Sequence, residues 1–209
     1  MPENTVAATP KKMVLITCRV DIVEHYNERR DALDQQWISL LMACGYLPVI
    51  APANREWLEH WLAQNEVSGV LLTGGNDLVA VGGSAQERDD AERWLINYCE
   101  SRRLPLLGVC RGMQLIGQYF GADLKAVDKM VEKQQINIID GCPVQVNSFH
   151  HYALAATPEM FSCFATSEDG AVIKGIKHQQ LPITGIMWHP ERRLPFDDSD
   201  KQLIQELYQ

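Results

Sequence analysis

The chain has 209 residues, which is enough for one large domain or at most two small ones. Its apolar fraction of 46% and charged fraction of 22% are ordinary for a globular protein. The formal net charge of −8 argues against a nucleic-acid-binding protein, whose binding face would be basic, and it gives no attraction to an anionic membrane.

The six cysteines lie at positions 18, 44, 99, 110, 142 and 163 and include no Cys-x-x-Cys pair, so a zinc site or a redox pair has no local support. We therefore expect free thiols in a reducing cytoplasm, with neither a metal nor a cofactor. Residues 1–12 are polar and are predicted to form a flexible N-terminal tail. We expect no signal peptide and no membrane span, because no apolar stretch has the required position or length.

The first half of the chain alternates short apolar runs with amphipathic segments. Runs rich in apolar and β-branched residues predict strands at 13–18, 46–51, 67–73 and 104–109. Apolar residues at helical spacing predict helices at 33–44, from Asn54 (the N-cap) to 62, around 91–99, and at 110–120. Such alternation is typical of βαβ units, so we predict a three-layer α/β fold with helices on both faces of a mostly parallel sheet.

Two polar stretches are predicted to be loops. Residues 19–31 carry many charges and are expected to lead into the first helix, and residues 123–140 are expected to form a loop over the site. The rest of the second half predicts strands at 143–147 and 183–188, a hairpin formed by 161–166 and 171–176, and a helix at 198–208. Since no repeat or linker divides the chain, we predict one domain over residues 13–209.

Cys110 lies where the strand 104–109 changes into the helix 110–120. Gly108 and Gly112 permit a tight backbone there, because neither places a Cβ in the turn. This strand–turn–helix geometry resembles a nucleophile elbow, and the helix N-terminus adds a partial positive charge. A lone buried cysteine is more often structural, but the flanking glycines and the change of period favour a nucleophile at this position.

A cysteine nucleophile needs a base and a group that orients the base. His189 ends an apolar strand and begins the sequence His-Pro-Glu191, whereas His25, His60 and His178 lie among polar residues and are expected to be solvated. Side chains at i and i+2 of an extended segment point the same way, so Glu191 is expected to hold one ring nitrogen of His189 and leave the other for the thiol. Taken alone, the segment also suits a proline turn with surface polar residues.

A reaction at a carbonyl also needs donors for the oxyanion. Gly74-Gly75 follows the strand 67–73, so it lies at the same edge of a parallel sheet as Cys110, where ligands collect. Its amides can approach a substrate closely, and the amide of Arg111 follows the nucleophile. A Gly-Gly turn is equally consistent with a simple chain reversal.

These residues carry a family resemblance. Gly108-x-Cys110-x-Gly112-x-Gln114, with the later His189-Pro-Glu191, resembles the class I glutamine amidotransferase superfamily. Within it, the segments 110–114, 147–151 and 188–191 are most similar to the γ-glutamyl hydrolase branch (peptidase C26), which includes γ-glutamyl-γ-aminobutyrate hydrolases. The likeness also takes in Arg19, the helix 34–45 and the sequence 72–75, and thus spans most of the chain.

The resemblance implies a flavodoxin-like α/β/α fold, a Cys110/His189/Glu191 triad and an oxyanion hole formed by the amides of Gly75 and Arg111. It implies that Cys110 attacks the γ-carbonyl of a small-molecule γ-glutamyl amide, that a γ-glutamyl thioester forms, and that water then releases glutamate. The residues expected to contact the substrate are Gly74, Asn76, Gln114, Ser148, Phe149, His150 and Arg19, with Asp77 and Tyr152 nearby. Most of these residues could equally be solvated loop residues that do not contact the substrate.

Two features depart from the branch and concern the leaving group rather than the triad. Residues 128–135 contain no histidine where members usually carry one or two, and the chain is short, so we expect trimmed substrate loops. The amine stays open between γ-aminobutyrate and a nucleotide amidate such as γ-glutamyl-CDP-amidate, and the short chain resembles the second group more.

Two other functions remain alternatives. The first is a glutaminase subunit that passes ammonia to a synthetase partner, although Arg111 differs from the residue that such subunits usually place after the cysteine. The second is a non-catalytic binding module on the same fold, against which the intact Cys, His and Glu set argues. The sequence leaves the oligomeric state open, and a homodimer is one possibility.

Overall fold

The computed structural model describes residues 12–128 and 131–209. The expected tail therefore lies outside the described residues except for its last position, as do two positions of the expected loop 123–140. All six cysteines are free thiols, as the sequence predicted. Within the described ranges, no helix is both long and apolar enough to cross a membrane.

Five parallel strands form one half of a nine-stranded sheet, in the order β4 (Leu47–Ala51), β1 (Met13–Thr17), β5 (Gly69–Leu72), β6 (Leu106–Val109) and β13 (Ile183–Ile186). The residues of β5, β6 and β13 are all buried, which explains why these strands read as continuous apolar runs. The predicted strands at these positions are confirmed.

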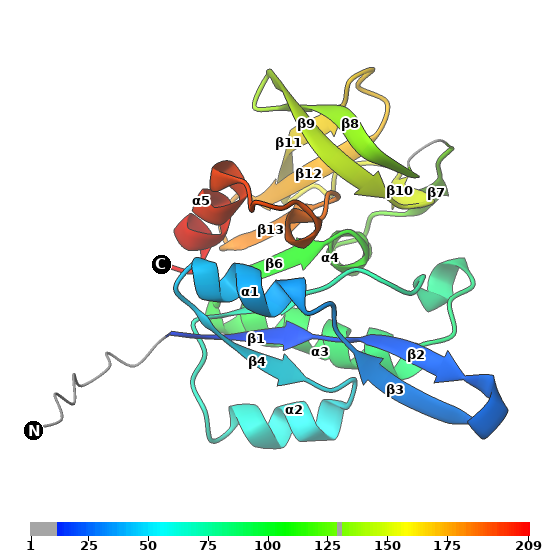
Figure 1. Ribbon diagram of the computed structural model, residues 1–209, viewed down its shortest axis with the longest axis vertical. Coiled ribbons are helices and arrows are strands. Elements are labelled where there is room, and N and C mark those ends of the chain that lie inside the picture. The colour runs from blue at the N-terminus through cyan, green and yellow to red at the C-terminus, as the bar shows by residue number, and fades with distance from the viewer. Residues whose placement is uncertain (1–11, 129–130) are drawn as a thin grey trace, which may run out of the picture.

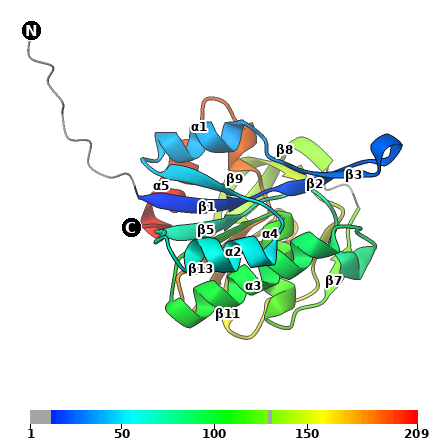
Figure 2. The same ribbon diagram turned by 90° about the horizontal axis from the view of Figure 1, so that it is seen from below.

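Helices cover both faces of this parallel half. Figure 2 shows α1 (Gln36–Ala43) on one face and α2 (Arg55–Leu62) and α3 (Gln86–Arg102) on the other. α4 (Arg111–Tyr119) packs beside α3, and α5 (Asp198–Leu207) lies near the end of α1. The predicted three-layer α/β architecture is confirmed.

The cap and the apolar spacing that predicted α2 are present in the structure. The side chain of Asn54 accepts a hydrogen bond of 2.8 Å from the amide of Trp57 and so caps α2 as predicted. On α2, Leu58 and Leu62 are buried, while Trp57 and Trp61 stack on each other half-buried.

The other half of the sheet is antiparallel and continues in the order β12 (Ile173–His178), β11 (Phe161–Ser167), β8 (Val131–Ile139) and β9 (Cys142–Phe149). In Figure 1 these strands rise above the parallel half. The predicted hairpin across 161–176 is confirmed as β11 and β12.

The expected loop at 123–140 is wrong over most of its length. It contains β7 (Leu124–Ala126), which pairs with β10 (Tyr152–Leu154), and half of it is the long strand β8. Val131 and Ile136 of β8 are exposed, and polar residues separate them, so the strand lacks the alternation that marks a half-buried strand. Pairing with β9 and β11, rather than local pattern, holds it in the sheet.

The expected loop at 19–31 is also wrong. It is a hairpin of β2 (Arg19–Val23) and β3 (Glu28–Ala32), joined by the 3₁₀ turn η1 (Glu24–Tyr26), and it projects from the carboxyl end of β1 (Figure 1). Val20 is the one buried residue of this hairpin, all of which the structure describes, so its sequence shows no apolar face. The hairpin is held instead by the Asn76 carboxamide, which bonds both backbone groups of Val20 at 2.8 Å.

Candidate functional site

Cys110 occupies a strained turn between β6 and α4. Its backbone has φ 53° and ψ −104°, a region that residues other than glycine rarely adopt. Its amide donates a 2.7 Å hydrogen bond to the carbonyl of Ile186 on the neighbouring strand β13, which fixes the turn against the sheet. This is the geometry of a nucleophile elbow.

Two glycines are required by the packing of this elbow. A Cβ on Gly112 would lie 2.3 Å from the carbonyl oxygen of Leu72, and a Cβ on Gly108 would lie 2.5 Å from Ile116 Cδ1. Both distances are far inside van der Waals contact. The helix can therefore approach β5 and β6 this closely only because these positions lack side chains.

His189 and Glu191 lie where β13 gives way to the short 3₁₀ turn η3 (Pro190–Arg192). Both side chains are about 1% exposed, and His189 Nδ1 lies 2.7 Å from Glu191 Oε1. A carboxylate accepts, so Nδ1 carries the proton and donates it. Nε2 has no conventional hydrogen-bond partner among the described residues, which leaves this nitrogen available to the thiol.

The pKa of His189 is raised to about 9. Burial alone would lower it, but the neighbouring Cys110 and then Glu191 stabilise the charged imidazolium more strongly. Cys110 is 6% exposed, and its thiol lies 3.9 Å from the carbonyl oxygen of Phe149. The structure thus brings together the three residues that the sequence predicted as a triad.

Asn147 holds His189 in place, a role that the sequence analysis did not assign to it although it lies in the segment 147–151. Its carboxamide forms two hydrogen bonds with the His189 backbone, accepting from N at 2.7 Å and donating to O at 2.8 Å. The ring of Phe149 then packs edge-on against the imidazole, with 5.8 Å between centroids. No local signal marks Asn147, because its partner is a backbone 42 positions away.

Gly74 lies directly beside the cysteine and the histidine. A Cβ at this position would be 2.7 Å from His189 Cε1 and 3.5 Å from Cys110 Cβ, so only glycine leaves room. Gly75 follows with φ +80° and packs on the side chain of Arg19. Gly74 and Gly75 therefore lie beside Cys110 at the edge of the sheet where β5 and β6 end, as the sequence predicted.

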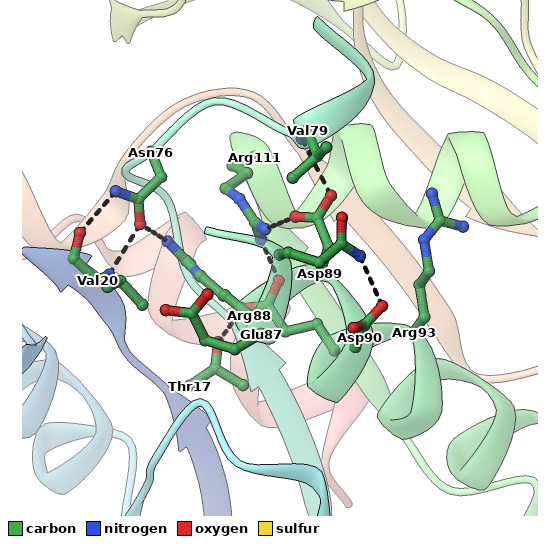
Figure 3. Close-up of polar contacts among 12 residues, drawn as sticks. Thr17, Val20, Asn76, Val79, Glu87, Arg88, Asp89, Asp90, Arg93 and Arg111 are labelled. Carbon is green, nitrogen blue, oxygen red and sulfur yellow. Dashed lines mark hydrogen bonds and ion pairs between the residues drawn. The ribbon is translucent and has the colours of Figure 1, made fainter. Parts of the chain in front are cut away.

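The amides of Gly75 and Arg111 are the predicted oxyanion donors. Arg111 opens α4, where the first N–H groups of a helix have no acceptor within the helix. Its side chain, by contrast, is buried and turns away to bond Asp89 and Glu92 (Figure 3). The Arg111 side chain thus lies in a buried ionic network, while its backbone amide lies at the N-terminus of α4 next to Cys110.

Sequence reasoning also missed a buried ionic network around Arg88. The Arg88 guanidinium donates to the carbonyls of Thr73, Gly74 and Gly75 and to the side chains of Asn76 and Glu92. Arg88 and Glu92 are four residues apart on α3, a spacing typical of solvated ion pairs, so the sequence offered no sign of burial.

The remaining residues that were predicted to contact the substrate differ in their burial and in their hydrogen-bond partners. Gln114 is buried and donates to the carbonyl of Tyr152 at 2.8 Å. Phe149 is half-buried, with the Arg192 guanidinium 4.8 Å from its ring centroid. Ser148 is buried and accepts a hydrogen bond of 3.2 Å from Lys174.

His150 is buried beside Lys174 and does not reach solvent. Its Nε2 lies 2.8 Å from Lys174 Nζ, and its Nδ1 lies 2.9 Å from the Tyr152 carbonyl, so Nδ1 donates and Nε2 accepts. Burial first, and then the Lys174 charge, lower the pKa of His150 to about 3. The ring is therefore neutral near pH 7, and both of its nitrogens are engaged within the protein.

Arg19 lines a cavity of about 290 Å³ beside the triad. Other residues of its wall include Asp34, Gly74, Glu191 and Arg192, but Asn76 is not among them. The Arg19 side chain is half-exposed and pairs with Asp21 at 2.9 Å. Arg19 and Arg192 thus line the same cavity beside the triad, where Arg192 Nε also lies 3.3 Å from Glu191 Oε1.

The prediction that His178 is solvated is wrong. It is buried against Phe120 and Phe161, and its Nδ1 accepts from the amides of Gln180 and Leu181 at 3.0 Å. His25 and His60 are exposed as expected. In the part of the chain that the structure describes, no three His, Cys, Asp or Glu residues group as a metal site would require.

Comparison with known proteins gives the family. The model of the glutamine amidotransferase class-I family matches residues 24–204. A protein of Campylobacter jejuni named γ-glutamyl-CDP-amidate hydrolase is 30% identical over 182 residues, covering 85% of this chain and 88% of its own length. A glutamine-hydrolysing GMP synthase subunit from Methanococcus maripaludis is 29% identical over 154 residues, covering 69% of this chain and 75% of its own.

Solved structures agree on the fold. A Thermoplasma acidophilum protein, solved as a candidate GMP synthase subunit, superposes with a TM-score of 0.71 at 18% sequence identity, covering 96% of this chain and 94% of its own. A glutamine amidotransferase from Thermotoga maritima gives 0.63 at 18% identity, covering 88% and 77%. With the family model matched across most of the sequence, the chain belongs to the class I glutamine amidotransferase family.

Proposed function

We propose that this protein is a cysteine-dependent hydrolase that cleaves a γ-glutamyl amide into glutamate and an amine. The observation that carries the proposal is the buried His189–Glu191 pair, whose imidazole interacts with Cys110, a cysteine held in a strained elbow. Membership of a family that includes glutamine-hydrolysing enzymes and the similarity to a γ-glutamyl-CDP-amidate hydrolase support hydrolase chemistry.

In the proposed mechanism, Cys110 and His189 begin as a thiolate and an imidazolium. The thiolate attacks the γ-carbonyl carbon, and the amides of Gly75 and Arg111 stabilise the oxyanion of the tetrahedral intermediate. The intermediate collapses when the C–N bond breaks and His189 Nε2 gives its proton to the leaving nitrogen. The product is a γ-glutamyl thioester on Cys110.

The second half of the reaction consumes water. His189, now neutral, removes a proton from a water molecule that attacks the thioester carbonyl. Collapse of this intermediate breaks the C–S bond, releases glutamate and restores the thiolate–imidazolium pair. Glu191 keeps Nδ1 protonated and the ring oriented throughout.

We infer that the leaving amine carries negative charge. The cavity beside the triad is lined by Arg19 and Arg192, and guanidinium groups suit phosphate and carboxylate. Both γ-glutamyl-CDP-amidate and γ-glutamyl-γ-aminobutyrate release such an amine. The Campylobacter jejuni relative favours the nucleotide amidate.

A glutaminase subunit is the second candidate function. The similarity to the Methanococcus maripaludis GMP synthase subunit favours it, because that relative is named as glutamine-hydrolysing. In this case the same thioester would form from glutamine, and the ammonia would pass to a partner chain.

Glutamate release by the purified protein from a panel of γ-glutamyl amides separates these functions. The panel contains glutamine, γ-glutamyl-γ-aminobutyrate and γ-glutamyl-CDP-amidate, and Cys110→Ser is the control. We expect release from an anionic amide far above glutamine, without a partner, and none from Cys110→Ser. Turnover of glutamine only, and only after cell extract is added, would favour the glutaminase subunit. No activity under either condition would contradict both.

A further inference from the structure

A buried ionic network lies directly behind the two predicted oxyanion donors. It consists of Arg88, Asp89 and Glu92 of α3 and Arg111 of α4, and each of these side chains is at most 5% exposed. Two guanidinium groups face two carboxylates, so the network is formally neutral. Figure 3 shows the Arg88 and Arg111 side chains extending into this cluster from different directions.

Arg88 determines how the Gly75 amide points. Its Nη2 donates to the carbonyl of Thr73 at 2.8 Å and to that of Gly74 at 3.1 Å, and its Nη1 donates to the carbonyl of Gly75. The Gly74 carbonyl and the Gly75 N–H belong to one trans peptide and so point in opposite directions. Holding the carbonyl toward Arg88 therefore turns the Gly75 N–H away from the network, to the side where a substrate would bind.

Arg111 contributes the second donor and belongs to the same network. Its side chain bonds Glu92 and Asp89, and this anchors the first residue of α4, whose amide follows Cys110. Asp89 in turn accepts from the amide of Val79 at 3.1 Å. The position of the Arg111 amide relative to α3 is thus fixed by charged groups.

Glu92 is the residue that joins the two halves. Its Oε1 accepts from Arg88 Nε at 3.0 Å and from Thr17 Oγ1 at 2.7 Å, and its Oε2 accepts from Arg111 Nη1. One carboxylate therefore binds both arginines, and through them the loop that carries Gly75 and the first residue of α4. Burying charge is costly, and buried ion pairs often add no net stability, so stability alone does not explain this arrangement.

We propose that Glu92 is a positioning residue that sets the spacing between the amides of Gly75 and Arg111, and so the stabilisation of the oxyanion. This inference rests on the proposed hydrolase function. Because the oxyanion exists in the transition state and not in the bound substrate, losing the alignment lowers kcat and leaves KM nearly unchanged.

The test compares Glu92→Gln with the wild type and with Glu87→Gln, an exposed neighbour on α3 that pairs with Arg29. For Glu92→Gln we expect kcat for γ-glutamyl amide hydrolysis to fall about 10- to 100-fold, with KM within about 2-fold. Alkylation of Cys110 by iodoacetamide forms no oxyanion, so its rate is expected to stay near the wild-type rate. Glu87→Gln is expected to match the wild type in all three measurements.

Thr17→Val provides a second variant that keeps all four charges, because it removes only the hydroxyl that donates to Glu92 and accepts from the Thr73 amide. If Glu92→Gln does not fold, the same split at smaller size is expected from Thr17→Val. An unchanged kcat in either folded variant, or an equal loss of hydrolysis and alkylation, would overturn the inference about Glu92. In that case a wild type that hydrolyses γ-glutamyl amides would still uphold the proposed function. A wild type that hydrolyses no γ-glutamyl amide would overturn both.

Discussion

His189 combines burial with charge, and this combination defines the chemistry available at the site. A buried imidazole without partners would be neutral, whereas Cys110 and Glu191 raise the pKa of this one to about 9. At neutral pH the ring therefore holds the proton that a departing amine needs. His150 is neutral because burial, and then the Lys174 charge, lower its pKa to about 3, and no carboxylate among the described residues offsets them as Glu191 does for His189.

Replacing Glu191 by Gln tests this account of His189. The wild-type imidazolium persists up to about pH 9 and is lost above it, so we expect kcat/KM to fall on the alkaline side near that pH. Gln has no charge to stabilise the imidazolium, so the pKa of His189 falls and the alkaline limb moves to lower pH. The measurement is the pH dependence of kcat/KM.

Glu206→Gln, an exposed substitution on α5, is the matched control and should leave the limb in place. An alkaline limb that is the same in Glu191→Gln as in the wild type would contradict the role given to Glu191.

Sequence reasoning works at the residue scale when the partners are close along the chain. Glu191 could be paired with His189 because the two residues are separated by one proline, and the structure places them in contact. Asn147 and Arg88 could not be found in this way. Their partners are backbone groups of distant segments, and nothing in a local pattern distinguishes Arg88 from a solvated arginine.

The elbow formed by β6 and α4 is the element on which the site depends. It holds Cys110 at a positive φ while α4 lies against the carboxyl ends of β5 and β6. Its signal was strong in the sequence, because a switch from an apolar run to helical spacing coincides with two glycines. The hairpin of β2 and β3 had no such signal, since charged side chains leave it without an apolar face.

Gly112→Ala tests whether the elbow requires close approach. The added Cβ would meet the Leu72 carbonyl at 2.3 Å, so α4 or β5 must shift. We expect kcat/KM to fall about 100-fold, as misplacement of a reacting group by about 1 Å does, and stability to fall by about 1–3 kcal/mol. Kinetics and urea unfolding measure the two effects.

Gly170→Ala separates geometry from stability. Gly170 has φ +74° in the turn between β11 and β12, with open space around it, so alanine there costs about 1–2 kcal/mol through strain alone. Its kcat/KM should stay within about 2-fold of the wild-type value. Full activity in Gly112→Ala would show that the elbow tolerates a wider approach.

At the scale of the whole molecule, one strand pairing assembles the site. β13 and β6 are parallel neighbours with Ile186 opposite Val109, so the residues that follow each strand leave the sheet together. This brings Cys110 and His189, 79 positions apart in the printed sequence, to one edge. β5 joins the same edge from the other side of β6 and supplies Gly74 and Gly75.

The parallel half of the sheet could be predicted because its buried strands are apolar throughout and alternate with amphipathic helices. The antiparallel half was predicted only in part. β11 and β12 flank a recognisable turn, whereas β8 is polar and is fixed by the strands on either side of it. Its place in the sheet is a tertiary property that its own residues do not encode.

The proposed mechanism depends on a covalent γ-glutamyl thioester on Cys110, and the most direct test is to trap this thioester. The protein is mixed with its best γ-glutamyl amide, quenched rapidly in acid, digested and examined by peptide mass spectrometry. We predict one γ-glutamyl group on the peptide that contains Cys110, and none in Cys110→Ser. Glutamate release that continues in Cys110→Ser, with Cys110 unmodified in the wild type, would contradict the proposed mechanism.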